Sequence, residues 1–186
     1  MVGLGNPGSR YERTRHNAGF LAVDELAART RAAGRLLSDA WVAEATLGGE
    51  PALLVKPQSY MNLSGEPVAR LLGEHASAAA DLVVVVDDVA LPLGRIRVRA
   101  HGSDGGHNGL RSLVAALGTE EFARVRIGVG LPELTELDLA DFVLAEFMLE
   151  EQPRLRAVTE LAADAVVCLL QEGAPAAMNR FNGRRV

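Results

Sequence analysis

The run Leu82-Val83-Val84-Val85-Val86, followed by Asp87-Asp88, is the stretch of sequence that decides the fold. An unbroken apolar run that is rich in β-branched residues is typical of a strand buried on both of its faces. Such strands belong to sheets whose two faces are both covered by helices. The run therefore predicts the central strand of an α/β fold, with the two aspartates at its carboxyl end.

Strands and helices alternate on both sides of this central run. Residues 125–129 and 52–55 have the pattern of further strands, and 41–47 pairs with 52–55 as a hairpin across Gly48-Gly49-Glu50-Pro51. Helical patterns cover residues 20–33, 68–75, 110–117 and 153–171. This order predicts an α/β fold with a mixed β-sheet flanked by helices. The length of 186 residues suits a single compact domain that spans residues 1–186.

The composition is that of an ordinary folded protein. Hydrophobic residues make up 48% of the chain and charged residues 23%, which argues against disorder. No apolar run approaches the roughly 20 residues that span a bilayer, and the first residues lack the pattern of a signal peptide. The single cysteine, Cys168, lies in an apolar stretch and is expected to be a buried thiol. These features predict a cytoplasmic protein without a membrane partner.

The net charge of -5 argues weakly against a nucleic-acid partner, but the distribution of charge matters more. The segment Arg95-Ile96-Arg97-Val98-Arg99 alternates strictly, as in a half-buried strand. Its three guanidinium groups then share one face, roughly 6.6 Å apart along the strand. This face is either a site for phosphate groups or a solvated sheet edge whose charge discourages aggregation.

The N-terminal glycines match the spacing of a dinucleotide-binding fingerprint, G-x-G-x-x-G, in Gly3-Leu4-Gly5-Asn6-Pro7-Gly8. That fingerprint needs a helix that opens at its last glycine. Here Asn6-Pro7-Gly8-Ser9 has the composition of a turn, and the helical pattern starts only near Asn17. The spacing therefore does not predict a nucleotide site, and a nucleotide-dependent oxidoreductase is the weakest of the functions considered.

Four blocks of polar residues resemble the signature of bacterial peptidyl-tRNA hydrolase. They are the Gly3–Gly8 block with Tyr11-x-x-Thr14-Arg15-His16-Asn17-Ala18-Gly19, Lys56-Pro57-Gln58-Ser59-Tyr60-Met61-Asn62-Leu63-Ser64-Gly65, Asp87-Asp88 with Leu91-Pro92-x-Gly94, and Gly105-Gly106-His107-Asn108-Gly109-Leu110. The resemblance runs from Met1 to about Asn182. It implies a monomeric single-domain α/β enzyme that needs no metal or organic cofactor. It also implies peptidyl-tRNA as the partner, bound through its acceptor stem and 3′ end.

His16 and Asp87 are the candidate catalytic residues. A histidine in the position of His16 is more often a cap or a surface residue. Ester hydrolysis needs a water that loses a proton near neutral pH, however, and imidazole suits that task. No Gly-x-Ser-x-Gly elbow and no second histidine at metal-ligand spacing is present, so direct attack by water is the simplest chemistry. The resemblance assigns the base to His16 and its carboxylate partner to Asp87, which would fix the imidazole tautomer.

Three asparagines from distant segments are candidate substrate-binding residues: Asn6, Asn62 and Asn108. Each of them is also compatible with a turn or a helix cap, the commoner role of asparagine. Carboxamides both donate and accept hydrogen bonds, so they can hold a peptide or a developing oxyanion. The resemblance implies that Asn6 and Asn108 position the peptide and the water. It places Asn62 and Met61 near the scissile ester.

Tyr11 is a secondary candidate. The resemblance places Tyr11 beside the catalytic cleft, where its ring either stacks on substrate or fills the turn. His107 is expected to be structural, and His75 to lie on the surface. Only Met1 and Val2 precede the Gly3 motif, so either the chain starts late relative to the family pattern or the first strand beneath Asn6 is shortened.

The resemblance also places Arg99 and Arg126 at a clamp for the 5′ phosphate of tRNA, a group that arginine binds with two parallel hydrogen bonds.

Two functions are consistent with the sequence. The first is the hydrolase, and the second is an RNA-binding protein on the same fold without hydrolysis, as in related organellar splicing factors. The presence of His16, Asp87 and all three asparagines favours the enzyme, because RNA binding alone does not need them.

Overall fold

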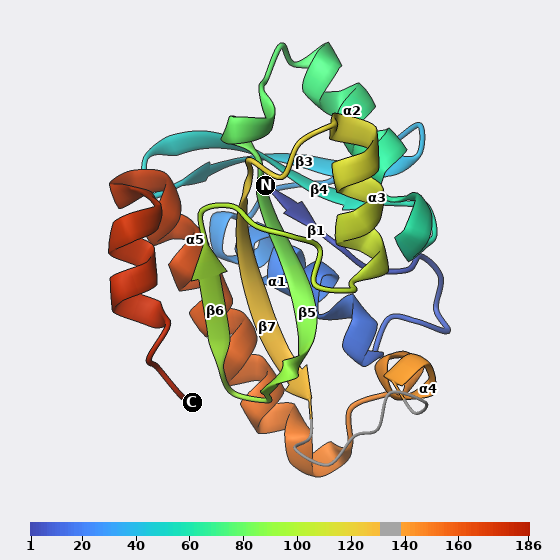
Figure 1. Ribbon diagram of the computed structural model, residues 1–186, viewed down its shortest axis with the longest axis vertical. Helices are drawn as coiled ribbons and strands as arrows, with labels where there is room; N and C mark the ends of the chain where they lie inside the picture. Colours follow the sequence, from blue (N-terminus) through green and yellow to red (C-terminus); the bar gives the residue numbers. More distant parts are fainter. Residues whose placement is uncertain (131–138) are drawn as a thin grey trace.

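A computed structural model describes residues 1–130 and 139–186. These residues form one seven-stranded sheet with the strand order β2-β3-β4-β1-β5-β7-β6 (Figure 1). The strands are β1 (Val2–Gly3), β2 (Arg35–Leu37), β3 (Ala40–Leu47), β4 (Glu50–Pro57), β5 (Val83–Pro92), β6 (Ile96–Arg99) and β7 (Ala123–Gly130). The four central strands, β4, β1, β5 and β7, run parallel, and β2, β3 and β6 add antiparallel edges. The prediction of a mixed sheet is confirmed.

Helices cover both faces of this sheet (Figure 1). The α-helices are α1 (Ala18–Thr30), α2 (Gly65–Glu74), α3 (Asn108–Leu117), α4 (Leu139–Leu144) and α5 (Gln152–Phe181). The described residues also include the short 3₁₀ turns η1 (Arg15–Asn17), η2 (Met61–Leu63), η3 (Ala79–Asp81) and η5 (Leu149–Glu151). Helices α1 and α5 pack together on one face, and α2 packs with α3 on the other.

Strand β5 separates two hydrophobic cores, as its sequence predicts. Val83 and Val85 belong to the core shared with α1 and α5, whereas Val84 and Val86 belong to the core shared with α2 and α3. All four side chains are buried. Successive residues of a strand point to opposite faces, so an unbroken run of valines fills both cores from one strand.

The predicted elements are present, with several changes in extent. The hairpin of β3 and β4 turns at Gly48 and Gly49, whose φ angles of +61° and +96° favour glycine. Strand β5 continues through Asp87 to Pro92 because β7 pairs with it beyond the apolar run, so Asp87 lies within the strand and not after its end. Strand β2 and helix α4 were not predicted.

The last helix differs most from its predicted extent. Its expected end before Gly173 is a real break, since Gly173 has φ +83° and ψ 170°. The chain then resumes helical geometry and continues to Phe181. By length and composition alone, the stretch Leu149–Phe181 resembles a membrane span. Its apolar residues, including the buried Cys168, pack in the core with α1, which is the behaviour of a core helix.

The N-terminal glycines do not open a helix. Strand β1 precedes them, but Gly8 and Tyr11 form a turn, and α1 starts only at Ala18. The helix context that a dinucleotide fingerprint requires is therefore missing, as the sequence predicts.

Candidate active site

The position of His16 follows from a close approach between α1 and the sheet. A Cβ atom on Gly19 would lie 2.4 Å from the carbonyl oxygen of Val85 and 2.5 Å from the backbone nitrogen of Leu4. Only glycine allows the first turn of α1 to rest directly on the backbone of β1 and β5. The preceding turn η1 is therefore held beside Asp87 of β5.

Arg15 anchors the same turn from the other side. Its buried guanidinium lies over the rings of Phe142 and Phe147, 4.6 and 4.7 Å from their centroids. One nitrogen of this group, Nη2, donates to Glu151 at 2.7 Å. The backbone N–H of Arg15 also donates to the carbonyl of Ala145. These contacts fix η1 against the segment before α5, a role that the sequence did not reveal.

His16 and Asp87 form the centre of the site. The His16 Nδ1 atom lies 2.9 Å from Asp87 Oδ1 and 3.0 Å from Oδ2, so it donates its N–H to the carboxylate. Asp87 is 2% exposed. Burial by itself would raise the pKa of the Asp87 carboxyl, but His107 and His16 together hold this pKa well below its ordinary value. A buried carboxylate with two N–H donors thus stays ionised at neutral pH.

His16 Nε2 has no hydrogen-bond partner among residues 1–130 and 139–186. Because Nδ1 carries the hydrogen that Asp87 accepts, Nε2 is the nitrogen that holds the lone pair in the neutral form of this ring. A neutral histidine with a free lone pair beside a buried carboxylate is the arrangement of a general base.

His107 joins the same carboxylate, which the sequence did not predict. Its Nε2 atom lies 3.0 Å from Asp87 Oδ1, and its ring centroid lies 5.0 Å from that of His16. His107 is also the N-cap of α3, where its Nδ1 accepts from the backbone N–H groups of Gly109 and Leu110 at 3.1 and 3.3 Å. The position of His107 directly before the helix that begins at Asn108 is the sequence signal that could have indicated this role.

The three side chains His16, Asp87 and His107 are close enough to suggest a metal site. Their potential ligand atoms all lie within 4.8 Å of one another. Metal binding through His107 Nε2 needs a lone pair on that nitrogen. The Nδ1 atom already uses its lone pair for the two backbone donors, so Nε2 carries the hydrogen. The hydrogen-bond pattern therefore fits a shared carboxylate better than a metal centre.

Asn6 is held firmly although β1 has only two residues. Its Oδ1 accepts from the backbone N–H of Met61 at 2.8 Å. The Asn17 carboxamide brackets the Asn6 backbone, with Oδ1 accepting from the Asn6 N–H at 2.8 Å and Nδ2 donating to the carbonyl at 2.9 Å. Asn17 thus links η1 to the Asn6 turn, and this role was also missed.

Asn62 and Asn108 are exposed and line one groove of about 540 Å³ between η2 and α3. Asn108 accepts from Arg111 at 3.3 Å. Gly109 brings the two elements together, because a Cβ there would lie 2.6 Å from the sulfur of the buried Met61. The structure therefore joins Asn6, Met61, Asn62 and Asn108 through direct contacts and one groove.

Tyr11 is half-buried in the turn between β1 and η1. The Arg10 guanidinium lies 5.6 Å from its ring centroid, and its carbonyl accepts from the Thr14 hydroxyl at 2.8 Å. These contacts give Tyr11 a role in the turn and do not connect its ring to the histidines.

The arginine strand has the predicted alternation. Ile96 and Val98 of β6 are buried, while Arg97 is half-buried and Arg99 exposed. Arg99 pairs with Arg124 of β7, and Arg97 pairs with Arg126, so Arg99 and Arg126 are diagonal neighbours on one face. Arg126 Nη2 donates to the carbonyls of Ser103 and Asp104 at 3.1 and 3.3 Å, and its Nη1 lies 3.6 Å from Asp88. The buried Arg124 instead donates to four backbone carbonyls, those of Gly102 and Ser103 in the neighbouring loop and those of Glu120 and Phe122 just before β7.

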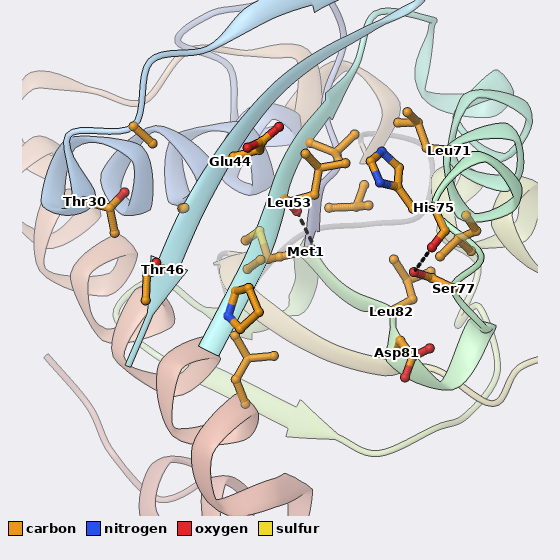
Figure 2. Close-up of a pocket in the computed structure, with 18 of the residues that line it drawn as sticks. Met1, Thr30, Glu44, Thr46, Leu53, Leu71, His75, Ser77, Asp81 and Leu82 are labelled. Carbon is orange, nitrogen blue, oxygen red and sulfur yellow. Dashed lines mark hydrogen bonds between the residues drawn. The ribbon is translucent and has the colours of Figure 1, made fainter. Parts of the chain in front are cut away.

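A larger cavity of about 1090 Å³ lies at the other end of the central strands (Figure 2). Met1, Leu53, Leu71, His75 and Leu82 are among its lining residues, and the Met1 amino group donates to the carbonyl of Leu53 at 2.9 Å. None of the predicted site residues lines it. His75 is exposed, as expected. This cavity is separate from the polar cluster around Asp87.

Comparisons with known proteins identify the family of this chain. The family model described as "Peptidyl-tRNA hydrolase" matches residues 1–186. A peptidyl-tRNA hydrolase of Chloroflexus aggregans is 49% identical over 186 residues, covering 98% of this chain and 97% of the relative. One from Alkaliphilus oremlandii is 45% identical over 184 residues, or 98% of each chain. The crystal structure of peptidyl-tRNA hydrolase from Acinetobacter baumannii superposes with a TM-score of 0.92 at 33% identity, covering 99% of this chain and 94% of the other. The chain therefore belongs to the peptidyl-tRNA hydrolase family.

Proposed function

We propose that this hydrolase uses His16 as a general base and Asp87 as its partner to cleave the ester between a peptide and the terminal ribose of tRNA. The observation that carries the proposal is the 2.9 Å contact between His16 Nδ1 and Asp87 Oδ1, which leaves Nε2 without a hydrogen-bond partner among residues 1–130 and 139–186. His16 Nε2 takes a proton from water while the water oxygen bonds to the ester carbonyl carbon. The tetrahedral adduct then breaks its bond to the ribose oxygen, which takes the proton back from His16. The products are a free peptide acid and tRNA.

The asparagines supply the neutral polar contacts that a peptide needs. Asn6 Oδ1 is engaged by Met61, so the donor Nδ2 is the atom it offers to a ligand. Asn62 and Asn108 offer their carboxamides from the exposed groove between η2 and α3. We assign Asn6 and Asn108 to the peptide and the attacking water, and Asn62 with Met61 to the peptide beside the ester. Tyr11 borders this region as a secondary contact.

The tRNA is held through its acceptor stem and 3′ end. Arg99 and Arg126 share the face of β6 and β7, and we assign them to the 5′ phosphate. Phosphate contacts position RNA without reading its sequence, which suits an enzyme that accepts many tRNAs. The active unit is one chain, a monomer with a single domain over residues 1–186, located in the cytoplasm and independent of cofactors.

Release of tRNA from N-acetyl-aminoacyl-tRNA tests the proposed reaction. The parent protein is expected to free the tRNA catalytically, at concentrations far below that of the substrate. An RNA-binding protein of the same fold would retain the intact ester and bind it stoichiometrically. Binding without any release would therefore reject the hydrolase in favour of that alternative.

Replacing both Arg99 and Arg126 with alanine is expected to weaken tRNA binding and to leave the chemical step largely intact. KM should rise, and the slope of log KM against log salt should become shallower by roughly one unit for each phosphate group that is no longer bound. The parent should prefer a substrate with a 5′ monophosphate, and the double variant should lose this preference. Steady-state constants for phosphorylated and dephosphorylated substrates measure both effects.

Arg29→Ala controls for the loss of an arginine away from this face, because Arg29 lies at the end of α1 and is paired with Glu25 and Asp164. This variant should keep the preference for the 5′ monophosphate. If the double variant discriminates between the two substrates as well as the parent does, the arginine face is only a solvated strand.

A further inference from the structure

Two histidines share one carboxylate, but their free nitrogens differ. His16 donates to Asp87 through Nδ1 and keeps Nε2 without a partner in the described part of the chain. His107 donates to Asp87 Oδ1 through Nε2 and uses Nδ1 to cap α3. A ring nitrogen that accepts hydrogen bonds carries no hydrogen, so the cap fixes the tautomer of His107.

We propose that His107 is a positioning residue that fixes Asp87 and draws part of its negative charge away from His16. The inference rests on the roles proposed above for His16 and Asp87. Asp87 Oδ1 accepts from both rings, at 2.9 and 3.0 Å, and Asp87 is buried from water. A carboxylate that already accepts one N–H attracts a second proton less strongly. His16 therefore holds its extra proton less tightly than it would beside an unshared Asp87.

The cap also decides which histidine receives the proton from water. A second proton on His107 would have to sit on Nδ1, where it would face the N–H groups of Gly109 and Leu110. The first turn of α3 would then lose its cap. A second proton on His16 goes to Nε2 and breaks no hydrogen bond among residues 1–130 and 139–186. The cap of α3 thus directs the proton to His16.

Several charged groups on neighbouring elements have partners of their own, and Asp141 of α4 and Glu66 of α2 are exposed. The ion pairs are Asp88–Arg126, Arg15–Glu151, Asp24–Lys56, Glu25–Arg29 and Asp104–Arg111. Among the described residues, His16 and His107 are the titratable groups bonded to Asp87. A change in the protonation of His16 on removal of His107 is therefore expected to act through Asp87.

The variant His107→Asn separates the two roles of this residue. Asparagine is a strong N-cap, so α3 keeps its cap, but the shorter carboxamide lacks the imidazole Nε2 that reaches Asp87. We expect the acidic limb of the kcat/KM profile to move to higher pH by about one unit, because His16 then holds its proton more tightly. The plateau should stay within about tenfold of the parent.

His107→Ala removes both the cap and the hydrogen bond to Asp87. This variant should show the same displacement of the acidic limb together with a lower melting temperature. If His107 is only structural, His107→Ala lowers the melting temperature and neither variant moves the limb, which would overturn the inference. Nitrogen-15 NMR of the parent reports the tautomer of His107 without relying on catalysis. A hydrogen on Nδ1 of His107 would also overturn the inference.

Asp87→Asn distinguishes this inference from the proposed mechanism. That variant should move the acidic limb in the opposite direction, to lower pH, because His16 loses the negative charge beside it. If Asp87→Asn moves the limb and His107→Asn does not, the role of His107 is rejected while His16 and Asp87 stand. If neither variant moves it, the partnership of His16 with Asp87 fails as well.

Discussion

Replacing His16 with alanine is expected to lower the turnover of N-acetyl-aminoacyl-tRNA by about 10²–10⁴-fold, the usual contribution of a general base. The variant removes the Nε2 lone pair that takes the proton from water. Asp87 cannot replace it as a base, because the pKa of this carboxyl is held well below its ordinary value. The loss should appear in kcat, while KM for the substrate should change little, since His16 acts in the chemical step.

The folded state of His16→Ala needs its own measurement. Circular dichroism and thermal unfolding should show a native fold, because Asp87 keeps the N–H of His107. His75→Ala is the matched control, since it removes an exposed histidine at the end of α2 that contacts no proposed site residue. Near-normal turnover by folded His16→Ala would reject the mechanism.

The fold was predictable because its strongest signal is local. The valine run of β5 needs no knowledge of distant residues to indicate burial on both faces, and the structure divides its side chains between two cores. Gly118 and Gly173 also mark real breaks in the chain, with φ angles of +68° and +83°. Strand β2 could not be predicted, because its three residues are mostly exposed and form a strand only by pairing with β3.

The site was predictable only in part, because some of its contacts depend on long-range packing. Asp87 was selected over Asp88 by its resemblance to a known motif, and the structure places it against His16. The contact of His107 with Asp87 requires the N-terminus of α3 to meet the middle of β5, across 20 residues. Asn17 likewise looked like the start of a helix, and its carboxamide instead holds the backbone of Asn6. Neither packing arrangement has a local sequence signal.

The arginine face shows a further limit of sequence patterns. Alternation in residues 95–99 correctly places the arginines on one side of β6. It cannot show which guanidinium groups are already hydrogen-bonded to other parts of the protein. Arg124 is buried and bonded to backbone carbonyls, whereas Arg99 is exposed at the strand end. These two arginines lie directly opposite each other, but Arg124 is bonded to the loop at Gly102 and Ser103 and to the segment before β7.

Asp87→Asn is expected to lower turnover by about 10- to 100-fold, less than the loss for His16→Ala. His16 Nδ1 faces both carboxylate oxygens, at 2.9 and 3.0 Å. An asparagine replaces one of these acceptors with an NH₂ donor, which favours the His16 tautomer with its hydrogen on Nε2. Nε2 is then unable to take a proton from water. The imidazole is still present, so residual activity should exceed that of His16→Ala.

The same variant should also change the dependence of stability on acid. The pKa of Asp87 is lower in the folded state than its ordinary value, so its ionised form favours folding. This contribution is complete above the ordinary pKa and is lost as pH falls toward the folded one. The free energy of unfolding of the parent should therefore fall more steeply below about pH 4 than that of Asp87→Asn. Urea unfolding at a series of pH values measures the difference.

Asp88→Asn is the matched control for both measurements on Asp87→Asn. It makes the same chemical change one residue later, at a carboxylate that accepts from the backbone N–H of Ala90 and lies 3.6 Å from Arg126. Neither of its contacts involves a histidine, so the acidic limb of its pH–rate profile should coincide with that of the parent. Equal displacement of the limb in both variants would mean that general electrostatics, and not the bond from His16 to Asp87, sets the profile. The partnership would then have to be abandoned even if Asp87→Asn were slow.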